Sequence, residues 1–207
     1  MNNIKVTGII LFIALIMNMG CQDSANENND NLPGKEELSI ISETNRVRTN
    51  PKEYASELRA ELEAGRDTWE LSDAGIEKIG QYEAAITTLE STTARNPLSF
   101  DDGLFRAARD HAEDMIENNF FSHTGSDGST SAARIRRHGS YSGTLGENIA
   151  AGTNRNTGVL MVLAWVLSPG HLGNMLRENY TLIGTAHLSG HPVYDWIAVQ
   201  NFAARKN

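Results

Sequence analysis

Hydrophobic residues recur at helical spacing through most of the chain after residue 35, and strand-like patterns appear mainly near its end. Apolar positions three or four residues apart predict helices that each bury one face. The first predicted helix carries one such stripe, which consists of Leu38, Ile41, Asn45 and Arg48. Asn50 followed by Pro51 indicates a helix restart, because asparagine favours the N-cap and proline the first helical position. Ser72 or Asp73 starts a further helix, which extends to about residue 90.

The middle of the chain predicts four more helices. Asp102 caps the first of them, and His111 lies on its apolar stripe, so we interpret His111 as a core-facing residue. A short helix over residues 129–137 and a strongly apolar helix over residues 157–167 follow. Ser168 and Pro169 then form another cap and first position, which places His171 in the opening turn of the last helix.

Two strand patterns near the end of the chain predict an antiparallel hairpin. Residues 181–188 and 193–202 are rich in β-branched and aromatic residues, and a turn sequence separates them. We expect the two histidines that bracket this turn, His187 and His191, to be exposed. Residues 145–150 form a shorter candidate strand. Helices around an antiparallel sheet in one compact domain predict an α+β fold of the α-β-α sandwich type.

The first 35 residues have the pattern of a targeting segment and not of a folded domain. Lys5 is followed by nine consecutive apolar residues, which are too few to span a bilayer and are typical of a secretory signal. Gly20-Cys21 at the end resembles the lipobox of bacterial lipoproteins, although Asn18 replaces the usual leucine. Residues 22–35 are rich in Asn and Asp, which is typical of a flexible tether.

These features divide the chain into three parts. We expect residues 1–20 to be a lipoprotein-type signal peptide, residues 21–35 to be a lipidated cysteine with its tether, and residues 36–207 to be the folded domain. A lipid on Cys21 would anchor a mature lipoprotein to a membrane of the cell envelope, facing the periplasm or the cell exterior.

Composition narrows the classes of function. The length of 207 residues has room for one sizeable domain. There are 18 Lys and Arg against 26 Asp and Glu, and the net charge of −8 disfavours nucleic acid as a partner. The single cysteine excludes an intrachain disulfide and a cysteine-rich zinc module. The domain therefore depends on its hydrophobic core for stability.

Three polar clusters interrupt core-like stretches, at residues 120–125, 146–150 and 165–171. They contain His123, Glu147 and His171, each beside glycine and large apolar residues, where a charge needs partners. Two imidazoles and a carboxylate could bind a divalent metal or act as general acid and base. The spacing does not decide between these roles, because the three residues come from different elements.

The three clusters, in this order, resemble the signature of the CAP superfamily, also called the SCP family, which includes cysteine-rich secretory, antigen 5 and pathogenesis-related proteins. Residues 45–51, 107–115 and 126–129 are also similar to bacterial members. The resemblance extends from about Leu38 to Phe202 and implies the CAP-type α-β-α sandwich with a central antiparallel sheet.

The resemblance also implies a central cleft lined by two histidines and, in many members, two acidic residues. His123 and His171 match the histidines, and Glu147 matches the first carboxylate. The position of the second carboxylate falls within residues 166–168, which contain no acid, so Ser168 is the polar residue expected there. The resemblance does not imply one agreed reaction.

The leading interpretation is a binding module of the cell envelope that holds a small apolar ligand, a divalent metal such as zinc, or a surface partner in this cleft. One alternative is a metal-assisted hydrolase or protease, with Glu147 as general base and the histidines as metal ligands. Another is a structural or adhesive envelope protein. The residues leave open whether the protein is an enzyme, and they name neither the ligand nor the substrate.

Two other features have simpler interpretations. Arg134, Arg136 and Arg137 form a small basic cluster, which we expect to be a salt-bridged face in an acidic protein. The segment 59–96 is longer than a minimal connection, and we expect its helix to pack on the domain rather than to cover the cleft as a lid.

Overall fold

The computed structural model describes residues 32–153 and 157–205. Cys21 and the predicted signal segment lie outside the described residues. The helices are α1 (Lys35–Thr49), α2 (Pro51–Trp69), α3 (Asp73–Ser91), α4 (Asp102–Glu117), α5 (Ser131–His138), α6 (Gly158–Val166) and α7 (Pro169–Met175). The strands are β1 (Ser99–Phe100), β2 (Tyr141–Gly152), β3 (Leu182–Ser189) and β4 (Trp196–Arg205).

The described strands form one sheet in the order β1-β3-β4-β2. The three long strands β3, β4 and β2 are antiparallel, and the short β1 joins the edge parallel to β3. Glu147 of β2 lies opposite Asn201 of β4, and a register shift separates Ser142 from Gly146. The strand β2 therefore forms an edge of the sheet, and the residues predicted for the site lie along or beside it.

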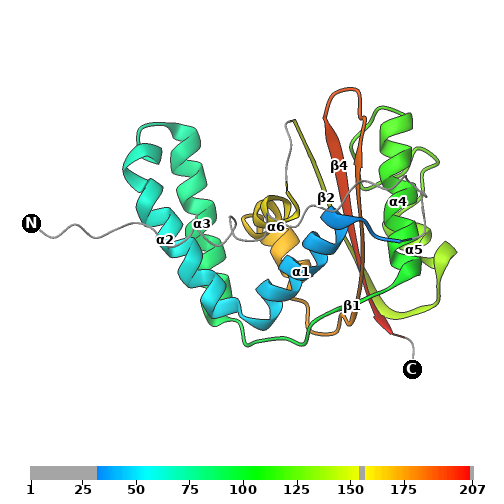
Figure 1. The fold of residues 1–207 in the computed structure, drawn as a ribbon, viewed down its shortest axis with the longest axis horizontal. Helices are drawn as coiled ribbons and strands as arrows, with labels where there is room; N and C mark the ends of the chain where they lie inside the picture. Colours follow the sequence, from blue (N-terminus) through cyan, green and yellow to red (C-terminus); the bar gives the residue numbers. More distant parts are fainter. Residues whose placement is uncertain (1–31, 154–156, 206–207) are drawn as a thin grey trace, which may run out of the picture. The chain divides into compact units, whose positions relative to one another are not determined.

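Helices cover both faces of this sheet, which confirms the α-β-α sandwich. Figure 1 shows α4 and α5 on one side of the sheet and α1 and α6 on the other, with α2 and α3 farther out on the side of α1. The core under α4 includes Met115, Ile149 and Val199. The larger core on the opposite face joins residues of α1, α2, α3, α6 and α7 to the sheet.

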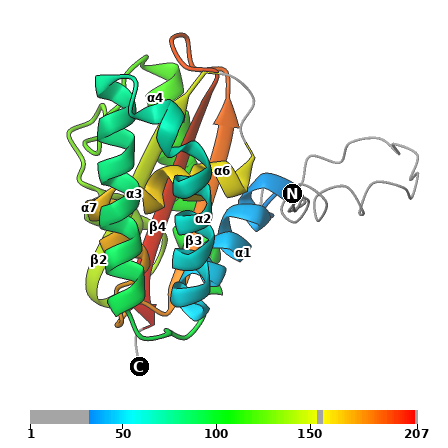
Figure 2. The ribbon, with the colours of Figure 1, turned by 90° about the vertical axis from the view of Figure 1, so that its left-hand side faces the viewer.

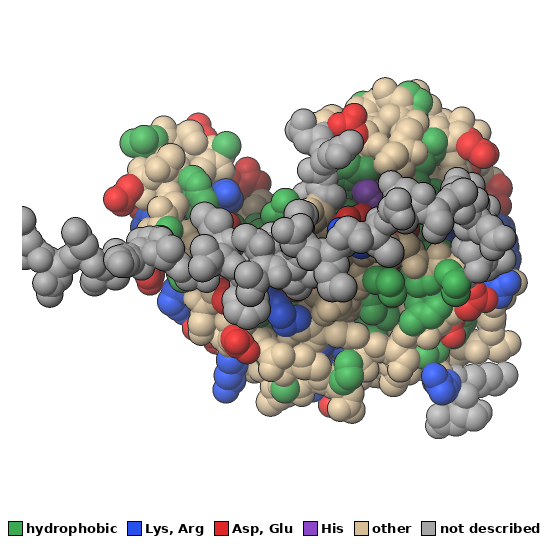
Figure 3. Space-filling view, in the orientation of Figure 1, with side chains coloured by type: hydrophobic (Ala, Val, Ile, Leu, Met, Phe, Trp, Pro, Cys, Tyr) green, Lys and Arg blue, Asp and Glu red, His purple; other side chains and the backbone are tan. Residues whose placement is uncertain are grey.

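The helices α2 and α3 form a hairpin that packs on this larger core (Figure 2). Leu58 of α2 and Tyr82 of α3 belong to the same hydrophobic cluster as Trp165 and Leu172. The expectation that the helix of segment 59–96 packs on the domain fits this burial. The outer end of the hairpin is more exposed than the part that packs on the core. Leu71 there is 83% exposed, and Figure 3 shows hydrophobic side chains at the surface of this end.

Two local predictions about helices were wrong by small shifts. Of the predicted α1 stripe, Leu38 is 53% exposed but Arg48 is buried, and the buried face of α1 also carries Ile40 and Val47. The face is set by α6, because a Cβ on Gly158 would lie 2.8 Å from the backbone nitrogen of Ile40, so the two helices approach closely. At α4, Asp101 rather than Asp102 is the N-cap, and its carboxylate accepts from the backbone nitrogen of Leu104.

Among the described helices, none is by itself long and apolar enough to cross a membrane. The helices α6 and α7 reach that criterion only as a pair, bent by 112°.

Candidate functional site

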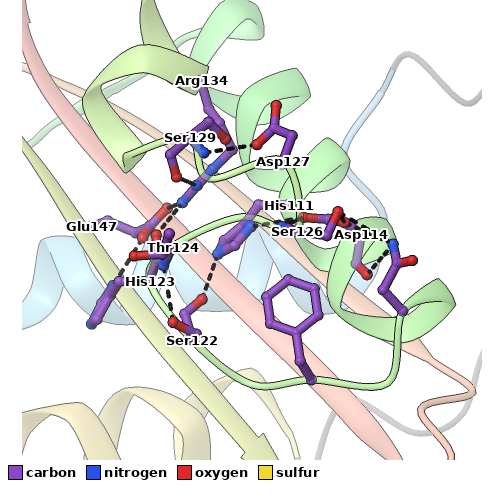
Figure 4. Close-up of polar contacts among 12 residues, drawn as sticks. His111, Asp114, Ser122, His123, Thr124, Ser126, Asp127, Ser129, Arg134 and Glu147 are labelled. Carbon is purple, nitrogen blue, oxygen red and sulfur yellow. Dashed lines mark hydrogen bonds and ion pairs between the residues drawn. The ribbon is translucent and has the colours of Figure 1, made fainter.

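The three predicted site residues come from three different elements. Glu147 lies in β2, His123 in the loop between α4 and α5, and His171 in the first turn of α7. Figure 4 shows His123 and Glu147 pointing toward each other beside the loop that precedes α5. The Glu147 side chain is 2% exposed and that of His123 is 56% exposed, so the pair runs from the interior to the surface.

The imidazole of His123 is oriented by the Glu147 carboxylate. His123 Nδ1 lies 2.8 Å from Glu147 Oε1. A carboxylate only accepts hydrogen bonds, so Nδ1 donates the proton and the neutral ring keeps its lone pair on Nε2. This arrangement of a histidine backed by a carboxylate is the one that orients imidazoles as metal ligands in proteins.

The other oxygen of Glu147 is bound by Arg134. Arg134 Nη2 donates to Glu147 Oε2 at 2.8 Å, and both side chains are buried. The same guanidinium donates to the carbonyl oxygens of His123, at 2.9 Å, and Ser129, at 2.8 Å. The predicted salt-bridged face is therefore present only in part. Arg137 pairs with Asp127 at the surface, whereas Arg134 is buried in the site. Helical spacing in so short a helix gave no signal for this burial.

Two buried histidines hold the segment that leads to His123. His111 Nε2 donates to the carbonyl oxygen of Ser122 at 2.8 Å, and burial lowers the pKa of His111. The interpretation of His111 as a core residue is confirmed. His191 Nε2 donates to the carbonyl oxygen of Phe120 at 3.2 Å, while its Nδ1 accepts from the backbone of Val193 and Tyr194.

The expectation that His187 and His191 are exposed was wrong. His191 is buried because the turn folds over it and its ring satisfies two backbone N–H groups of that turn. His187 is half-buried, and burial lowers its pKa, although Glu37 and Glu36 act in the opposite direction.

His171 lies on a helix that begins where the sequence predicts, at Pro169 after Ser168. The ring is half-buried, and burial, followed by the electrostatic effect of nearby His123, lowers the pKa of His171. The imidazole is therefore neutral near pH 7 and has a lone pair to donate. Ser168 occupies the N-cap position, but its side chain makes no capping hydrogen bond to α7.

The donor set that this geometry leaves for a metal is smaller than the predicted one. Within the part of the chain that the structure describes, no group of three or more His, Cys, Asp and Glu side chains is arranged to hold a metal ion. Both oxygens of Glu147 are engaged, one by His123 and one by Arg134. Glu147 therefore acts as the hydrogen-bond partner of His123, which leaves the imidazoles of His123 and His171 as the candidate metal ligands of the predicted set.

Comparison with known proteins gives a family match over most of the chain. The model of the cysteine-rich secretory protein family, CAP, matches residues 41–202. Over 120 residues the chain is 29% identical to the uncharacterized protein YkwD of Bacillus subtilis strain 168, and this match covers 56% of the chain and 46% of YkwD. The match thus spans less than half the length of that relative.

Solved structures with partial similarity include two bacterial proteins. An outer surface protein of Borrelia burgdorferi is 28% identical with a TM-score of 0.48, over 65% of this chain and 97% of that one. An extracellular protein with an SCP domain from Bacillus anthracis is 28% identical with a TM-score of 0.46, over 65% of this chain and 44% of that one.

Proposed function

Because the chain belongs to the cysteine-rich secretory protein (CAP) family, whose model matches residues 41–202, we propose that it is a CAP-domain binding protein of the cell envelope. Its ligand is a divalent metal ion of the zinc class, held by the imidazoles of His123 and His171. The observation that carries this proposal is the hydrogen bond from His123 Nδ1 to Glu147, which leaves Nε2 of an exposed histidine with a lone pair.

The chemistry of the site favours a metal over an apolar ligand. Imidazole nitrogens suit zinc and neighbouring transition metals, and a ligand histidine gains basicity from a carboxylate on its other nitrogen. Burial keeps His171 neutral, so no proton has to leave it before it binds a cation near pH 7. A zinc ion with few protein ligands keeps coordination positions open for a second molecule.

A hydrolase that uses Glu147 as general base is less well supported. A general base needs a free lone pair within reach of the proton that it removes. Glu147 instead accepts hydrogen bonds from His123 and Arg134, and its side chain is almost fully buried. If His123, Glu147 and His171 have a purely structural role, their replacement should lower the melting temperature without affecting metal binding.

Zinc binding is tested by equilibrium dialysis of the purified domain, followed by mass spectrometry of the bound metal. The wild-type protein should bind zinc, and His123→Ala and His171→Ala should each lose it under the same conditions. His138→Ala is the matched control, because His138 at the end of α5 pairs with Asp110 of α4 and is not a site residue. A wild-type protein that stays metal-free at saturating zinc, with variants that only melt earlier, would establish the structural role instead.

We also propose that a lipid on Cys21 anchors the protein. The support is the sequence alone: a short apolar segment that ends in Gly20-Cys21, followed by an Asn- and Asp-rich tether. A net charge of −8 gives no attraction to anionic lipid, so attachment would depend on the lipid. Cells fed a fatty-acid analogue should label the wild-type protein and the control Gln22→Ala, but not Cys21→Ala. Labelling that persists in Cys21→Ala contradicts the anchor.

A further inference from the structure

We infer that Asn148 and Asn174 position the His171 imidazole relative to the pair of Glu147 and His123. We call these two side chains the amide clasp. Asn148 follows Glu147 in β2, and Asn174 lies one helical turn after His171 in α7. The effect of these asparagines on metal binding rests on the proposed function. Their effect on the position of His171 can be measured without a metal.

The two amides cross-link the strand and the helix reciprocally. Asn148 Nδ2 donates to the carbonyl oxygen of His171 at 3.3 Å. Asn174 Nδ2 donates to the carbonyl oxygen of Glu147 at 3.2 Å and to Asn148 Oδ1 at 2.9 Å. Each asparagine thus binds the backbone of the site residue on the other element. The relative position of His171 and Glu147 is therefore set by three directional contacts.

A buried polar chain fixes the orientation of the clasp. Gln200 Nε2 donates to Thr44 Oγ1 at 2.8 Å, which leaves Gln200 Oε1 to accept from Asn148 Nδ2 at 3.0 Å. Asn148 must then direct Oδ1 toward Asn174. Thr44, Asn148 and Gln200 are fully buried, so reversing the side-chain amide of Asn148 or Gln200 would leave a donor or acceptor unpaired away from water.

Apolar packing alone does not fix α7 in this register. Leu172 and Met175 bury their side chains in the core, but hydrophobic contact is non-directional. The helix has seven residues, too few to be stable without tertiary contacts. The carbonyl oxygens of Glu147 and Ile149 on edge strand β2 accept from Asn174 and Trp165, so polar donors of α7 and α6 locate both helices along the strand.

The first test is the zinc affinity of clasp variants, measured by competition with a chelator. Asn174→Ala removes both donated bonds and should weaken zinc binding about tenfold or more, as loss of outer-sphere partners does at other metal sites. Asn174→Asp keeps the size of the side chain but cannot donate, and it should show the same loss. If zinc affinity stays within about twofold of wild type in a folded clasp variant, the inference is wrong.

Asn45→Ala is the matched control for this experiment. Asn45 also joins two segments through its amide, donating to the carbonyl oxygen of Leu98 at 3.0 Å and accepting from the Leu98 nitrogen at 2.7 Å. It lies in α1 and makes neither contact with a site residue. Its removal should lower the melting temperature while zinc affinity stays at the wild-type value, which separates positioning from general destabilisation.

A second readout needs no metal and so separates the clasp from the proposed function. Diethylpyrocarbonate modifies accessible neutral imidazoles, and mass spectrometry of the peptides resolves His171 from His123. In wild type the half-buried His171 should react more slowly than the exposed His123. Asn174→Ala should raise the ratio of His171 to His123 labelling several-fold, and Asn45→Ala should not. An unchanged ratio in Asn174→Ala overturns the clasp, even if the wild-type protein binds no zinc.

Discussion

Arg134 forms a buried ion pair with Glu147, and through this pair the helix α5 contacts the candidate site. Its guanidinium binds Glu147 and also two carbonyl oxygens of the loop that carries His123. Separating buried opposite charges is costly, because the charge that remains has no water to replace its partner. The ion pair that holds the carboxylate behind His123 should therefore be costly to break.

Arg134→Met should lower the free energy of unfolding by about 3–5 kcal/mol, because it leaves Glu147 charged and buried with one partner fewer. Arg137→Met is the comparison within the same helix. Its ion pair with Asp127 is exposed and screened by water, so its loss should change stability much less. Urea denaturation of both variants measures the difference. Equal, small effects would mean that Glu147 finds another partner or that water reaches it.

At the scale of single elements, patterns that depend on neighbouring residues predicted the structure well. The starts of α2 and α7 follow from a proline preceded by a residue that favours the N-cap. The hairpin of β3 and β4 follows from its two β-rich runs. The strand β1 could not be predicted, because two residues carry no pattern and its partner Leu182 lies far along the chain.

The residues of the candidate site were predicted only in part, for a related reason. The structure brings His123 to Glu147, as the clusters suggested, whereas their role in binding stays a prediction. Arg134 and Asn174 could not be identified, because each gains its role from contacts across elements that the chain order does not reveal. His191 was misjudged because a histidine in a turn sequence has no local sign that the turn will fold over it.

At the scale of the whole molecule, histidines that folding buries wholly or partly make stability depend on pH. Burial lowers the pKa values of His111, His171 and His187, so these rings resist protonation in the folded state. In the unfolded chain a histidine titrates near its ordinary value of about 6.5. The unfolded state therefore binds more protons below that pH, and the free energy of unfolding falls as the pH falls.

His111→Gln should reduce this pH dependence. Glutamine can place an amide donor near the position of His111 Nε2, so it can keep a bond to Ser122, but it does not titrate. Wild type should lose stability between about pH 7 and pH 5, and the variant should lose less. Asp114 does not interfere in this window: burial opposes the shift, but hydrogen bonds from Ser126 lower its pKa below an already acidic value. Urea denaturation at each pH gives both slopes, and identical slopes would show that His111 is not a source of the dependence.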